Sequence, residues 1–413
     1  MFLSLKIVKE AKEVLRKFAM QVPSTLFSVE RQIFIGKEII RKIPEQEKGL
    51  LRKFMNGILL QMRDAGASDI DFGGWGAKHE VWLRVNGIKR PAPEFGSHEI
   101  DEANILIQNL LMESQRQTLY DYRNLDFSYN INHNETIARY RANVYFDIDS
   151  LSLNMRAINT EIRNYESYGF NSNVTSLLSL VHTKEGLILV TGITGSGKST
   201  TLDAIVDLNN RCVNAHIIII ASPVEFVHES KKCIIRHREV GRDTRSFKMG
   251  TIEALRQDPD IIVIGEMREA DTIMAALEVA DSGHKVLSTL HTSSAVESID
   301  RIIGEVPPIE QERVINRLAD ILKCVVSQKL VPSEDGKRIL AKEIMVMTPS
   351  IRAAIKNKNT SEIYQMINEG RKYGMITIEQ DLARLAMEKK VSVTNAVNFA
   401  NNKRRVKQLL KLA

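Results

Sequence analysis

Runs of mostly apolar residues recur through the middle of the chain. Stretches of helical character separate them, and they occupy residues 187–190, 216–220, 261–264 and 285–290. Strands of a parallel sheet are buried on both faces, so they read as continuous apolar runs joined by helical crossovers. The pattern predicts a parallel α/β core over residues 174–306. Beyond the two prolines at 307 and 308 the pattern is mostly helical, which predicts a helical C-terminal subdomain over residues 307–413.

Shorter alternating segments precede this core. Residues 80–85 alternate between apolar and polar and end at Asn86-Gly87, a dipeptide typical of a two-residue hairpin turn. Residues 138–145 and 151–156 alternate in the same way, whereas residues 49–64 have the spacing of an amphipathic helix. We predict a small mixed α/β domain over residues 49–170, with a linker at residues 171–173.

Residues 1–48 have a helical and basic pattern. Leu5, Val8, Leu15 and Phe18 recur at helical spacing, with lysine and arginine between them. A helix of this kind either lies on a membrane surface or packs against its own protein or a partner. Packing is the commoner outcome, and we interpret the segment as a basic helical N-terminal extension.

The composition restricts where the chain works. The 413 residues include 57 lysines and arginines and 51 aspartates and glutamates, and the resulting net charge of +6 is modest. The three cysteines are odd in number and form no Cys-x-x-Cys pair, which argues against a disulfide framework or a zinc site and fits a reducing compartment. The longest apolar runs are far too short to span a bilayer, and the N-terminus lacks a secretory signal pattern. We expect a cytoplasmic protein.

A phosphate-binding motif follows the first apolar run. Residues 192–199 read Gly-Ile-Thr-Gly-Ser-Gly-Lys-Ser, which matches G-x-x-x-x-G-K-[ST] between a predicted strand and a predicted helix. Glycines let backbone amides turn toward phosphate oxygens, and the helix N-terminus adds its dipole. The motif predicts ATP binding, with Lys198 at the β- and γ-phosphates and the Ser199 hydroxyl on Mg²⁺. The predicted nucleotide-binding residues are Gly192, Thr194, Gly195, Ser196, Gly197, Lys198, Ser199 and Thr200.

A carboxylate ends the third apolar run. Residues 261–264 are followed by Gly265 and Glu266, and four apolar residues ending in an acid describe a Walker B strand, whose carboxylate lies beside the magnesium shell. An acid at this point is also common as a cap of the next helix. The P-loop upstream favours the functional interpretation, so we predict that Glu266 is a catalytic and magnesium-associated residue.

Three further polar side chains lie close to predicted strands. Glu225 follows the run at 216–220, at the edge of a parallel sheet where ligands bind, and a carboxylate there can polarise an attacking water. Spacing alone leaves this role and that of a simple surface glutamate about equally open. His284 and His291 flank the run at 285–290, and spacing alone assigns neither of them a function.

Several further motifs occur in one order along the chain: Ala67-Ser68-Asp69-Ile70, Asp126-Phe127-Ser128-Tyr129, residues 223–233, Arg238-Glu239-Val240, residues 258–268, Thr289-Leu290-His291-Thr292, and Glu343-Ile344-Met345 with residues 348–352. Together with the P-loop they resemble the secretion ATPases of the type II/type IV superfamily, and among them most the PilT-like pilus retraction ATPases. The resemblance covers roughly residues 50 to 400.

The resemblance implies a fold and a set of catalytic roles. The fold would be a PAS-like N-terminal α/β domain, followed by a RecA-like P-loop ATPase core with a helical C-terminal subdomain. Glu225 falls on the family's water-activating glutamate, and Glu266 falls on its Walker B glutamate. His284 and His291 fall on the histidine box that senses the γ-phosphate.

The resemblance also implies an assembly. Arg139, Arg141 and Arg156 match arginines of the N-terminal domain, some of which reach nucleotide across a subunit boundary, although arginines on a solvated strand face look the same in sequence. The implied protein is a homohexamer that hydrolyses ATP with Mg²⁺ and powers a type IV pilus machine. It would act in the cytoplasm, peripherally at the inner membrane, with a platform protein or secretion-system proteins as partners and no direct nucleic-acid contact.

Departures from the family pattern keep an alternative open. The usual Glu-Asp-Pro is replaced by Ala221-Ser222-Pro223. The serine, together with Val331-Pro332 and residues 335–338, resembles the DotB- and TraJ-like ATPases of type IVB secretion and conjugation. Residues 1–48 have no counterpart in the short retraction ATPases. The alternative function is a traffic ATPase of a type IVB secretion or conjugative transfer system.

Two other functional classes are disfavoured. A nucleic-acid motor would need a basic groove interleaved with aromatic residues for stacking. Aromatic residues make up 6% of the chain, and the clearest basic cluster, within residues 403–411, lacks them. A non-hydrolysing ring subunit would usually have lost Lys198 or Glu266, and both are present.

Overall fold

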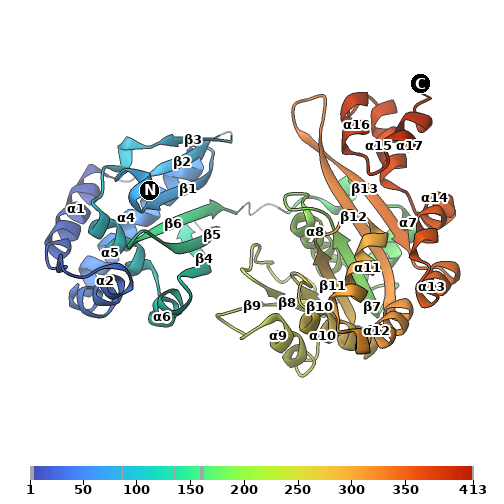
Figure 1. Ribbon diagram of the computed structural model, residues 1–413, viewed down its shortest axis with the longest axis horizontal. Helices are drawn as coiled ribbons and strands as arrows, with labels where there is room; N and C mark the ends of the chain where they lie inside the picture. The colour runs from blue at the N-terminus through green and yellow to red at the C-terminus, as the bar shows by residue number, and fades with distance from the viewer. Residues whose placement is uncertain (1–3, 86, 134–135, 159–161, 412–413) are drawn as a thin grey trace. The chain divides into compact units, whose positions relative to one another are not determined.

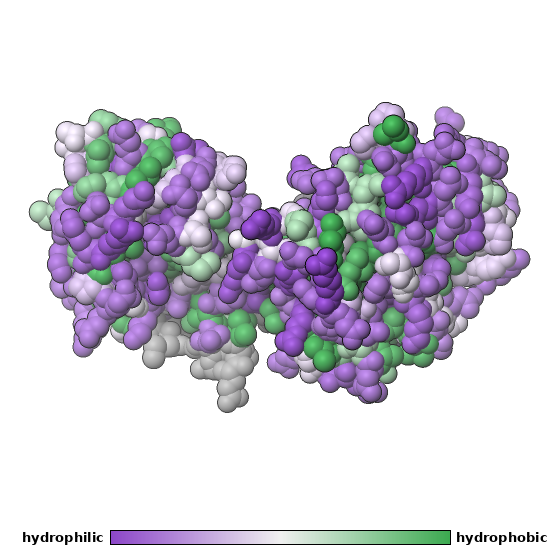
Figure 2. Space-filling model, turned by 90° about the horizontal axis from the view of Figure 1, so that it is seen from below, coloured by the Kyte–Doolittle hydropathy of each residue, from purple (hydrophilic) through white to green (hydrophobic). Residues whose placement is uncertain are grey.

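Two sheets of different construction organise the chain (Figure 1). The computed structural model describes residues 4–85, 87–133, 136–158 and 162–411. The chain divides into unit 1, residues 1–160, and unit 2, residues 161–413. The face shown in Figure 2 is mostly hydrophilic, with small separate apolar areas on both units. Within the described residues, no helix has both the length and the apolar character needed to cross a membrane.

Unit 1 contains a six-stranded antiparallel sheet in the order β3-β2-β1-β6-β5-β4. Its strands are β1 (Ala67–Gly73), β2 (Trp82–Val85), β3 (Ile88–Pro91), β4 (Asn124–His133), β5 (Thr136–Asp147) and β6 (Ser150–Ala157). The alternating segments predicted as strands are confirmed as β2, β5 and β6. Val85 pairs with Ile88, as expected for a two-residue hairpin loop, while Asn86 itself lies outside the described residues.

Helices cover one face of this sheet. α4 (Glu45–Asp64) packs on β1, α5 (Ile100–Leu110) packs on β6, and α6 (Glu113–Tyr122) packs on β4. Side chains at alternate positions of β5, such as Tyr140 and Ala142, are fully buried in the resulting core. The other face of the sheet carries the polar positions of the same strands.

The N-terminal extension packs on its own protein, which is one of the two interpretations left open by its pattern. It forms α1 (Leu5–Ala19), α2 (Ser28–Phe34), the π-helical η1 (Ile35–Ile39) and α3 (Ile40–Lys42). The Ser4 side chain caps α1 by accepting from the Ile7 amide. Leu15 and Phe18 are buried in one core with Leu51 of α4.

Unit 2 contains a seven-stranded sheet in the order β13-β12-β7-β11-β10-β8-β9. Its strands are β7 (Gly186–Thr191), β8 (His216–Ala221), β9 (Ile234–Glu239), β10 (Ile261–Ile264), β11 (Lys285–Leu290), β12 (Leu322–Pro332) and β13 (Arg338–Val346). Neighbouring strands from β9 to β12 pair in parallel, and β13 pairs antiparallel with β12. The four apolar runs are confirmed as the buried strands β7, β8, β10 and β11.

Both faces of this sheet are covered, which explains why the strands β7, β8 and β10 are almost entirely apolar. Leu187 and Leu189 of β7 belong to one core with α10 (Ala270–Asp281), α11 (Ala295–Glu305) and α12 (Pro308–Ile321). Ile188 and Val190 of the same strand belong to a second core, on the side of α7 (Ser172–Leu178) and α8 (Lys198–Cys212).

The structure differs from two sequence expectations at the ends of unit 2. Residues 307–413 include α13 (Pro349–Lys356), α14 (Ile363–Glu369), α15 (Ile378–Met387), α16 (Val393–Phe399) and α17 (Lys403–Leu409), but they also contribute β12 and β13 to the sheet. Ser327 and Gln328 interrupt the apolar run of β12, so its pattern does not stand out as a strand. The residues predicted as a linker begin α7, because the Asn171 side chain caps that helix. The domain boundaries predicted at 48, 170 and 306 stay predictions.

Candidate nucleotide-binding site

Two glycines shape the loop that connects β7 to α8. Gly192 has a φ of 152°, and a Cβ atom at this position would lie 2.5 Å from the Gln328 carbonyl oxygen. Gly197 is the N-cap of α8 with a φ of 87°, in the left-handed region that favours glycine. A side chain at either position would force the loop to move, so this path depends on glycine at both.

β12 supports the loop from the other side, which sequence reasoning missed. Gln328 Nε2 donates a hydrogen bond of 2.7 Å to the Ser196 carbonyl oxygen. The hydroxyl groups of Thr191, at the end of β7, and Ser327 lie 2.6 Å apart. These contacts exist because β12 pairs with β7, and no local motif in residues 322–332 announces that pairing.

The loop and the first turn of α8 fit a phosphate group. Lys198 Nζ donates to the carbonyl oxygens of Gly192 at 2.9 Å and Ile193 at 3.2 Å. Burial lowers the pKa of Lys198, while Glu266 and Glu225 oppose that shift. The buried Ser196 Oγ has no hydrogen-bond partner among the described residues. A buried ammonium group and an unpartnered hydroxyl, inside a loop of backbone amides, are what an anion requires.

The remaining P-loop residues face outward. Thr194 and Gly195 are exposed in the loop, and Ser199 and Thr200 are exposed in the first turn of α8. Within the described parts of the chain, no group of three or more His, Cys, Asp or Glu side chains is arranged to hold a metal ion. A magnesium ion here would therefore depend on a hydroxyl ligand, water and nucleotide oxygens, which is the coordination that Mg²⁺ commonly takes beside phosphates.

The two predicted catalytic glutamates come together at the edge of the sheet that carries the P-loop. β8 and β10 are parallel neighbours, and the Gly265 amide donates to the Ile220 carbonyl oxygen at 2.8 Å. Glu266 follows Gly265, and Glu225 lies in the loop after β8. Both carboxylates act electrostatically on Lys198, which places them on the same side of the site.

The loop that carries Glu225 is held by an edge strand. The buried Glu239, at the end of β9, accepts a hydrogen bond of 3.1 Å from the Val224 amide through its Oε2 atom. The Val240 amide donates to the Ala221 carbonyl oxygen at 2.9 Å. In the sequence Glu239 stands out only as part of a motif, because its contact with Val224 requires β9 to lie beside β8.

His291 joins this edge beside Glu266. The distance from its Nε2 atom to Glu266 Oε2 is 3.8 Å. A cavity of about 270 Å³ adjoins both side chains and is lined by Glu266, Met267, Arg268, Thr289, Leu290, His291 and Arg301. Burial lowers the pKa of His291, as do Lys198, Arg301 and Arg268, whereas Glu266 raises it. The imidazole is therefore neutral near pH 7, and Arg268 and Arg301 are additions to the predicted site.

The structure corrects the expectation for His284. This residue lies at the opposite end of β11 from His291, where its carbonyl oxygen accepts from the Gly186 amide at 3.0 Å. A strand rises about 3.3 Å per residue, so the two histidines lie roughly 20 Å apart. The Ser282 Oγ lies 3.0 Å from His284 Nδ1, and this contact is local to the turn before the strand. His284 does not reach the nucleotide site of its own chain.

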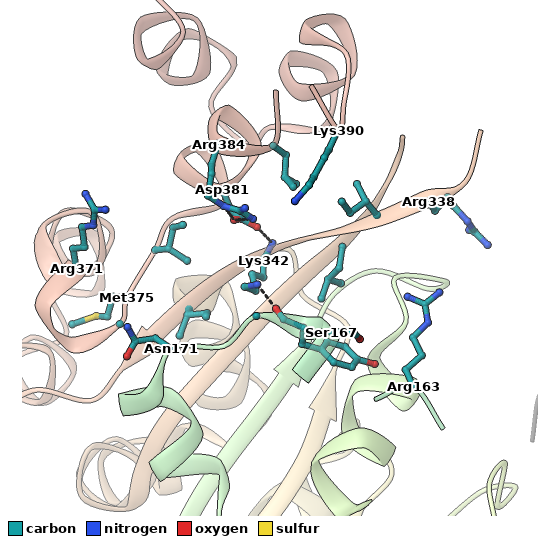
Figure 3. A pocket seen from close by; sticks show the side chains of 18 residues that line it. Arg163, Ser167, Asn171, Arg338, Lys342, Arg371, Met375, Asp381, Arg384 and Lys390 are labelled. Carbon is teal, nitrogen blue, oxygen red and sulfur yellow. Dashed lines mark hydrogen bonds and ion pairs between the residues drawn. The ribbon is translucent and has the colours of Figure 1, made fainter. Parts of the chain in front are cut away.

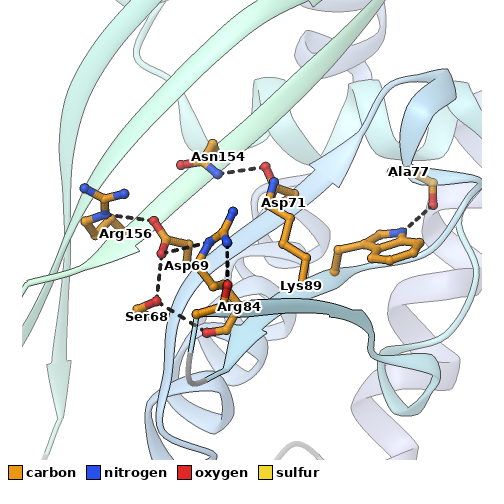
Figure 4. A network of polar contacts seen from close by, with 10 residues as sticks. Ser68, Asp69, Asp71, Ala77, Arg84, Lys89, Asn154 and Arg156 are labelled. Carbon is orange, nitrogen blue, oxygen red and sulfur yellow. Dashed lines mark hydrogen bonds and ion pairs between the residues drawn. The ribbon is translucent and has the colours of Figure 1, made fainter. Parts of the chain in front are cut away.

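The three predicted arginines lie in unit 1, on the polar side of the sheet. Arg141 of β5 is directly opposite Arg156 of β6, and both are exposed, whereas Arg139 is buried. Arg156 Nε donates to Asp69 Oδ1 at 2.8 Å, within a polar network that also includes Arg84 (Figure 4). Unit 1 thus places two exposed arginines side by side and binds one of them to a buried aspartate.

Comparison with known proteins identifies the family of the chain. The sequence profile of the family described as type II/IV secretion system protein matches residues 44–411. The chain is 39% identical over 331 residues to the type IV pilus retraction ATPase PilT of Pseudomonas aeruginosa, covering 80% of this chain and 93% of the relative.

Solved structures give the same result. The crystal structure of the pilus retraction motor PilT with bound ADP matches with a TM-score of 0.76 and 34% identity, over 85% of this chain and 98% of that chain. The X-ray structure of the Legionella pneumophila ATPase DotB matches with a TM-score of 0.67 and 25% identity, over 83% and 94%. The expected fold, a PAS-like N-terminal domain before a RecA-like core, is confirmed. This chain belongs to the type II/IV secretion system protein family.

Proposed function

We propose that this protein hydrolyses ATP with Mg²⁺ in a homohexameric ring that powers retraction of a type IV pilus. The observation that carries the proposal is the meeting of Lys198, Glu225, Glu266 and His291 at one edge of the sheet. The chain is also 39% identical, over most of both sequences, to a pilus retraction ATPase. An active site with these groups supports phosphoryl transfer to water.

Each side chain has a distinct part in the proposed reaction. Lys198 binds and neutralises the phosphate oxygens, and Glu225 polarises the water that attacks the γ-phosphate. Mg²⁺, held through the Ser199 hydroxyl with Glu266 beside its shell, would offset the charge on the phosphates. His291 is neutral, so its ring N–H can donate a hydrogen bond to a γ-phosphate oxygen without adding charge to the site.

The ring would complete the site. Arg141 of β5 and Arg156 of β6 are exposed on the same face of the sheet. At least one arginine of unit 1 would act on nucleotide bound by a neighbouring subunit. Such a ring would work in the cytoplasm, peripherally at the inner membrane, and pass its domain movements to a platform protein. We do not expect the ring to contact nucleic acid directly.

The type IVB alternative has weaker support. Ser222 resembles that branch, and the DotB structure matches with 25% identity. The PilT structure matches with 34% identity and a higher TM-score, and the PilT sequence matches with 39%. The retraction function is therefore the better supported of the two.

A deletion of the gene in its own cell tests the choice between them. If the protein powers retraction, the deletion strain should display surface pili that fail to retract when filmed with a fluorescent pilus label. Wild-type protein should restore retraction, and the Glu225→Gln variant should not. Normal retraction in the deletion strain, together with lost protein export or plasmid transfer, would refute the retraction function and support the alternative.

A further inference from the structure

A second and larger cavity lies within unit 2. Its volume is about 570 Å³, and it is bounded by residues 163–171, by β13 and by residues 371–390 (Figure 3). None of the P-loop residues, Glu225, Glu266 or His291 lines it. The activity proposed above gives this cavity no role.

The lining of this cavity is strongly cationic. Six of its side chains are basic and only Asp381 is acidic; the basic ones are Arg163, Arg338, Lys342, Arg371, Arg384 and Lys390. Arg384 pairs with Asp381 at 2.7 Å and with Glu388 at 2.8 Å, and Lys390 also pairs with Glu388. Among the described residues, no carboxylate lies within ion-pair distance of the remaining three arginines or of Lys342 Nζ. A concave surface with such an excess of positive charge concentrates anions.

Lys342 is the most buried of these cations. It is 8% exposed, on β13, and its Nζ donates to the Tyr168 carbonyl oxygen. Asp381 Oδ2 accepts from the backbone amide of Lys342 rather than from its ammonium group (Figure 3). Burial lowers the pKa of Lys342, Asp381 opposes that shift, and Arg384 and Lys390 add to it. The ammonium group also lies over the Phe170 ring, 5.5 Å from its centroid. Neither of these contacts carries a negative charge, so an anion beside this buried ammonium group would stabilise it further.

The rest of the lining indicates the kind of anion. Leu340, Ile344, Met375, Ile376 and Leu385 are the apolar wall of the cavity. A volume of this size, with an apolar wall and a few charged groups, is typical of a small-molecule site. The charged groups lie on several sides of the cavity, with Arg371 and Arg338 on opposite sides of Lys342 (Figure 3). Guanidinium groups match phosphate oxygens with paired hydrogen bonds, which an ammonium group cannot do. Three arginines without carboxylate partners at the rim therefore suit an oxyanion such as phosphate.

We propose that this cavity binds a phosphate-bearing molecule, with Lys342 at the buried end and Arg338 and Arg371 at the rim. The phosphate would compete with the Tyr168 carbonyl oxygen for the Lys342 ammonium group. Tyr168 also donates through its hydroxyl to the Thr200 carbonyl oxygen, in the first turn of α8 at 3.1 Å. Occupancy of the cavity would thus act on the segment that touches the P-loop helix.

Binding, rather than turnover, tests the proposal, so that its failure is distinct from a failure of the proposed ATPase function. The probes are radiolabelled inorganic pyrophosphate and ADP in equilibrium dialysis with the full chain carrying Lys198→Ala. Adding Arg338→Glu and Arg371→Glu should weaken binding of a probe at least tenfold. Both side chains are exposed, so the fold should survive, and circular dichroism would check this.

The matched control is Arg404→Glu with Lys407→Glu in the same background. These residues are exposed on α17, lie outside the cavity and give the same change in charge. The control should bind as tightly as the parent. Equal weakening by the two pairs would show a general charge effect and overturn the proposal. Lys342→Met should weaken binding as well, with the rim arginines intact.

Cosedimentation with vesicles identifies the source of the phosphate. Vesicles of phosphatidylglycerol would be compared with vesicles of phosphatidylcholine, which carry no net charge. Binding of the soluble probes supports a free phosphate ligand. Capture by phosphatidylglycerol that is lost in the Arg338→Glu, Arg371→Glu chain, without soluble binding, supports a lipid headgroup. If the chain binds neither the soluble probes nor the phosphatidylglycerol vesicles, the proposed site is refuted.

Discussion

Lys198 is the cation closest to where phosphate is expected, and its ammonium group donates to two carbonyl oxygens of its own loop. Lys198→Ala should abolish turnover and strongly weaken ATP binding, because it removes the charge that faces the phosphates. Phosphate release and titration with a fluorescent nucleotide would measure the two effects. Turnover above about a tenth of wild type would contradict the P-loop assignment. Lys232→Ala, an exposed lysine of the same unit, should behave as wild type.

Glu225 and Glu266 lie at the same edge of the sheet as Lys198, but we expect them to contribute to ATP hydrolysis rather than to nucleotide binding. Glu225→Gln and Glu266→Gln should each bind nucleotide normally and hydrolyse it about 10²-fold more slowly or worse, as for groups that act in the transition state. Single-turnover rates at saturating ATP would separate binding from chemistry. Glu229→Gln, an exposed neighbour, serves as the control. Normal hydrolysis by Glu225→Gln would show that Ala221 and Ser222 mark a rearranged site.

Glu343 links β13 to the start of α11 in unit 2. It lies on β13, is 2% exposed, and its Oε1 accepts from the Ala295 amide, at the start of α11, at 2.8 Å. Burial raises the pKa of Glu343 to about 7, the Ala295 amide opposes the shift, and Glu379 adds to it. The carboxyl group therefore holds its proton in the folded chain over a range where an ordinary glutamate, near 4.5, has lost it.

The pH dependence of stability follows from that shift. Between pH 4.5 and about 7 the folded chain binds a proton that the unfolded chain has released, so stability decreases as the pH rises through this window. Glu343→Gln cannot ionise, and relative to wild type it should gain up to about 3 kcal/mol on going from pH 5 to pH 8. Thermal unfolding at both pH values measures the difference. The exposed Glu334→Gln should show no such change, and a pH-independent effect of Glu343→Gln would refute the assigned titration.

The proposed ring makes a prediction about mixtures of subunits. If an arginine of unit 1 completes a neighbour's site, inert Arg→Ala protomers should lower the turnover of the wild-type subunits mixed with them. Arg141 is the first choice, because it is exposed, whereas Arg139 is buried and Arg156 is bound to Asp69. Titrating wild-type protein with Arg141→Ala, and then with the other two variants, would follow turnover per wild-type subunit.

The mixing experiment has a matched control. Arg90→Ala changes an exposed arginine on β3 of the same unit, and its mixtures should show simple averaging. Flat curves for all three test variants, in preparations shown to contain mixed hexamers, would reject shared active sites. Curves that fall below the average would establish both the ring and the arginine that couples its sites.

Local sequence patterns predict many of the strands of unit 2 and its P-loop. The strands β7, β8 and β10 are visible in the sequence because burial on two faces leaves an unbroken apolar run, whereas β11 is a shorter apolar pattern that includes Ser288 and Thr289. The P-loop was recognised because its glycines, lysine and serine are adjacent in sequence and follow a strand. β12 is not visible as a strand in the sequence, since Ser327 and Gln328 interrupt its apolar run, and their contacts with Thr191 and Ser196 exist only in the folded chain.

Lys285 shows how the fold changes the meaning of a residue. It begins a run that was predicted as a buried strand, and it is fully buried despite its charge. Its Nζ donates to the carbonyl oxygens of Leu177, Ser179 and Thr183, at the end of α7. Those acceptors lie about a hundred residues away in the chain, so no local pattern distinguishes this lysine from an exposed one.

The sequence by itself determined the P-loop, the parallel character of the core and the family, because each depends on short motifs and runs that can be recognised one by one along the chain. The order of the strands, β7-β11-β10-β8, was decided only by the tertiary structure. That order brings Glu225, Glu266 and His291 to Lys198. It also sets β12 and β13 beside β7, which supports the P-loop and builds the cationic cavity. These contacts depend on strand pairing between segments that are distant in the sequence. The free energy of that pairing cannot be read from the sequence of either segment alone.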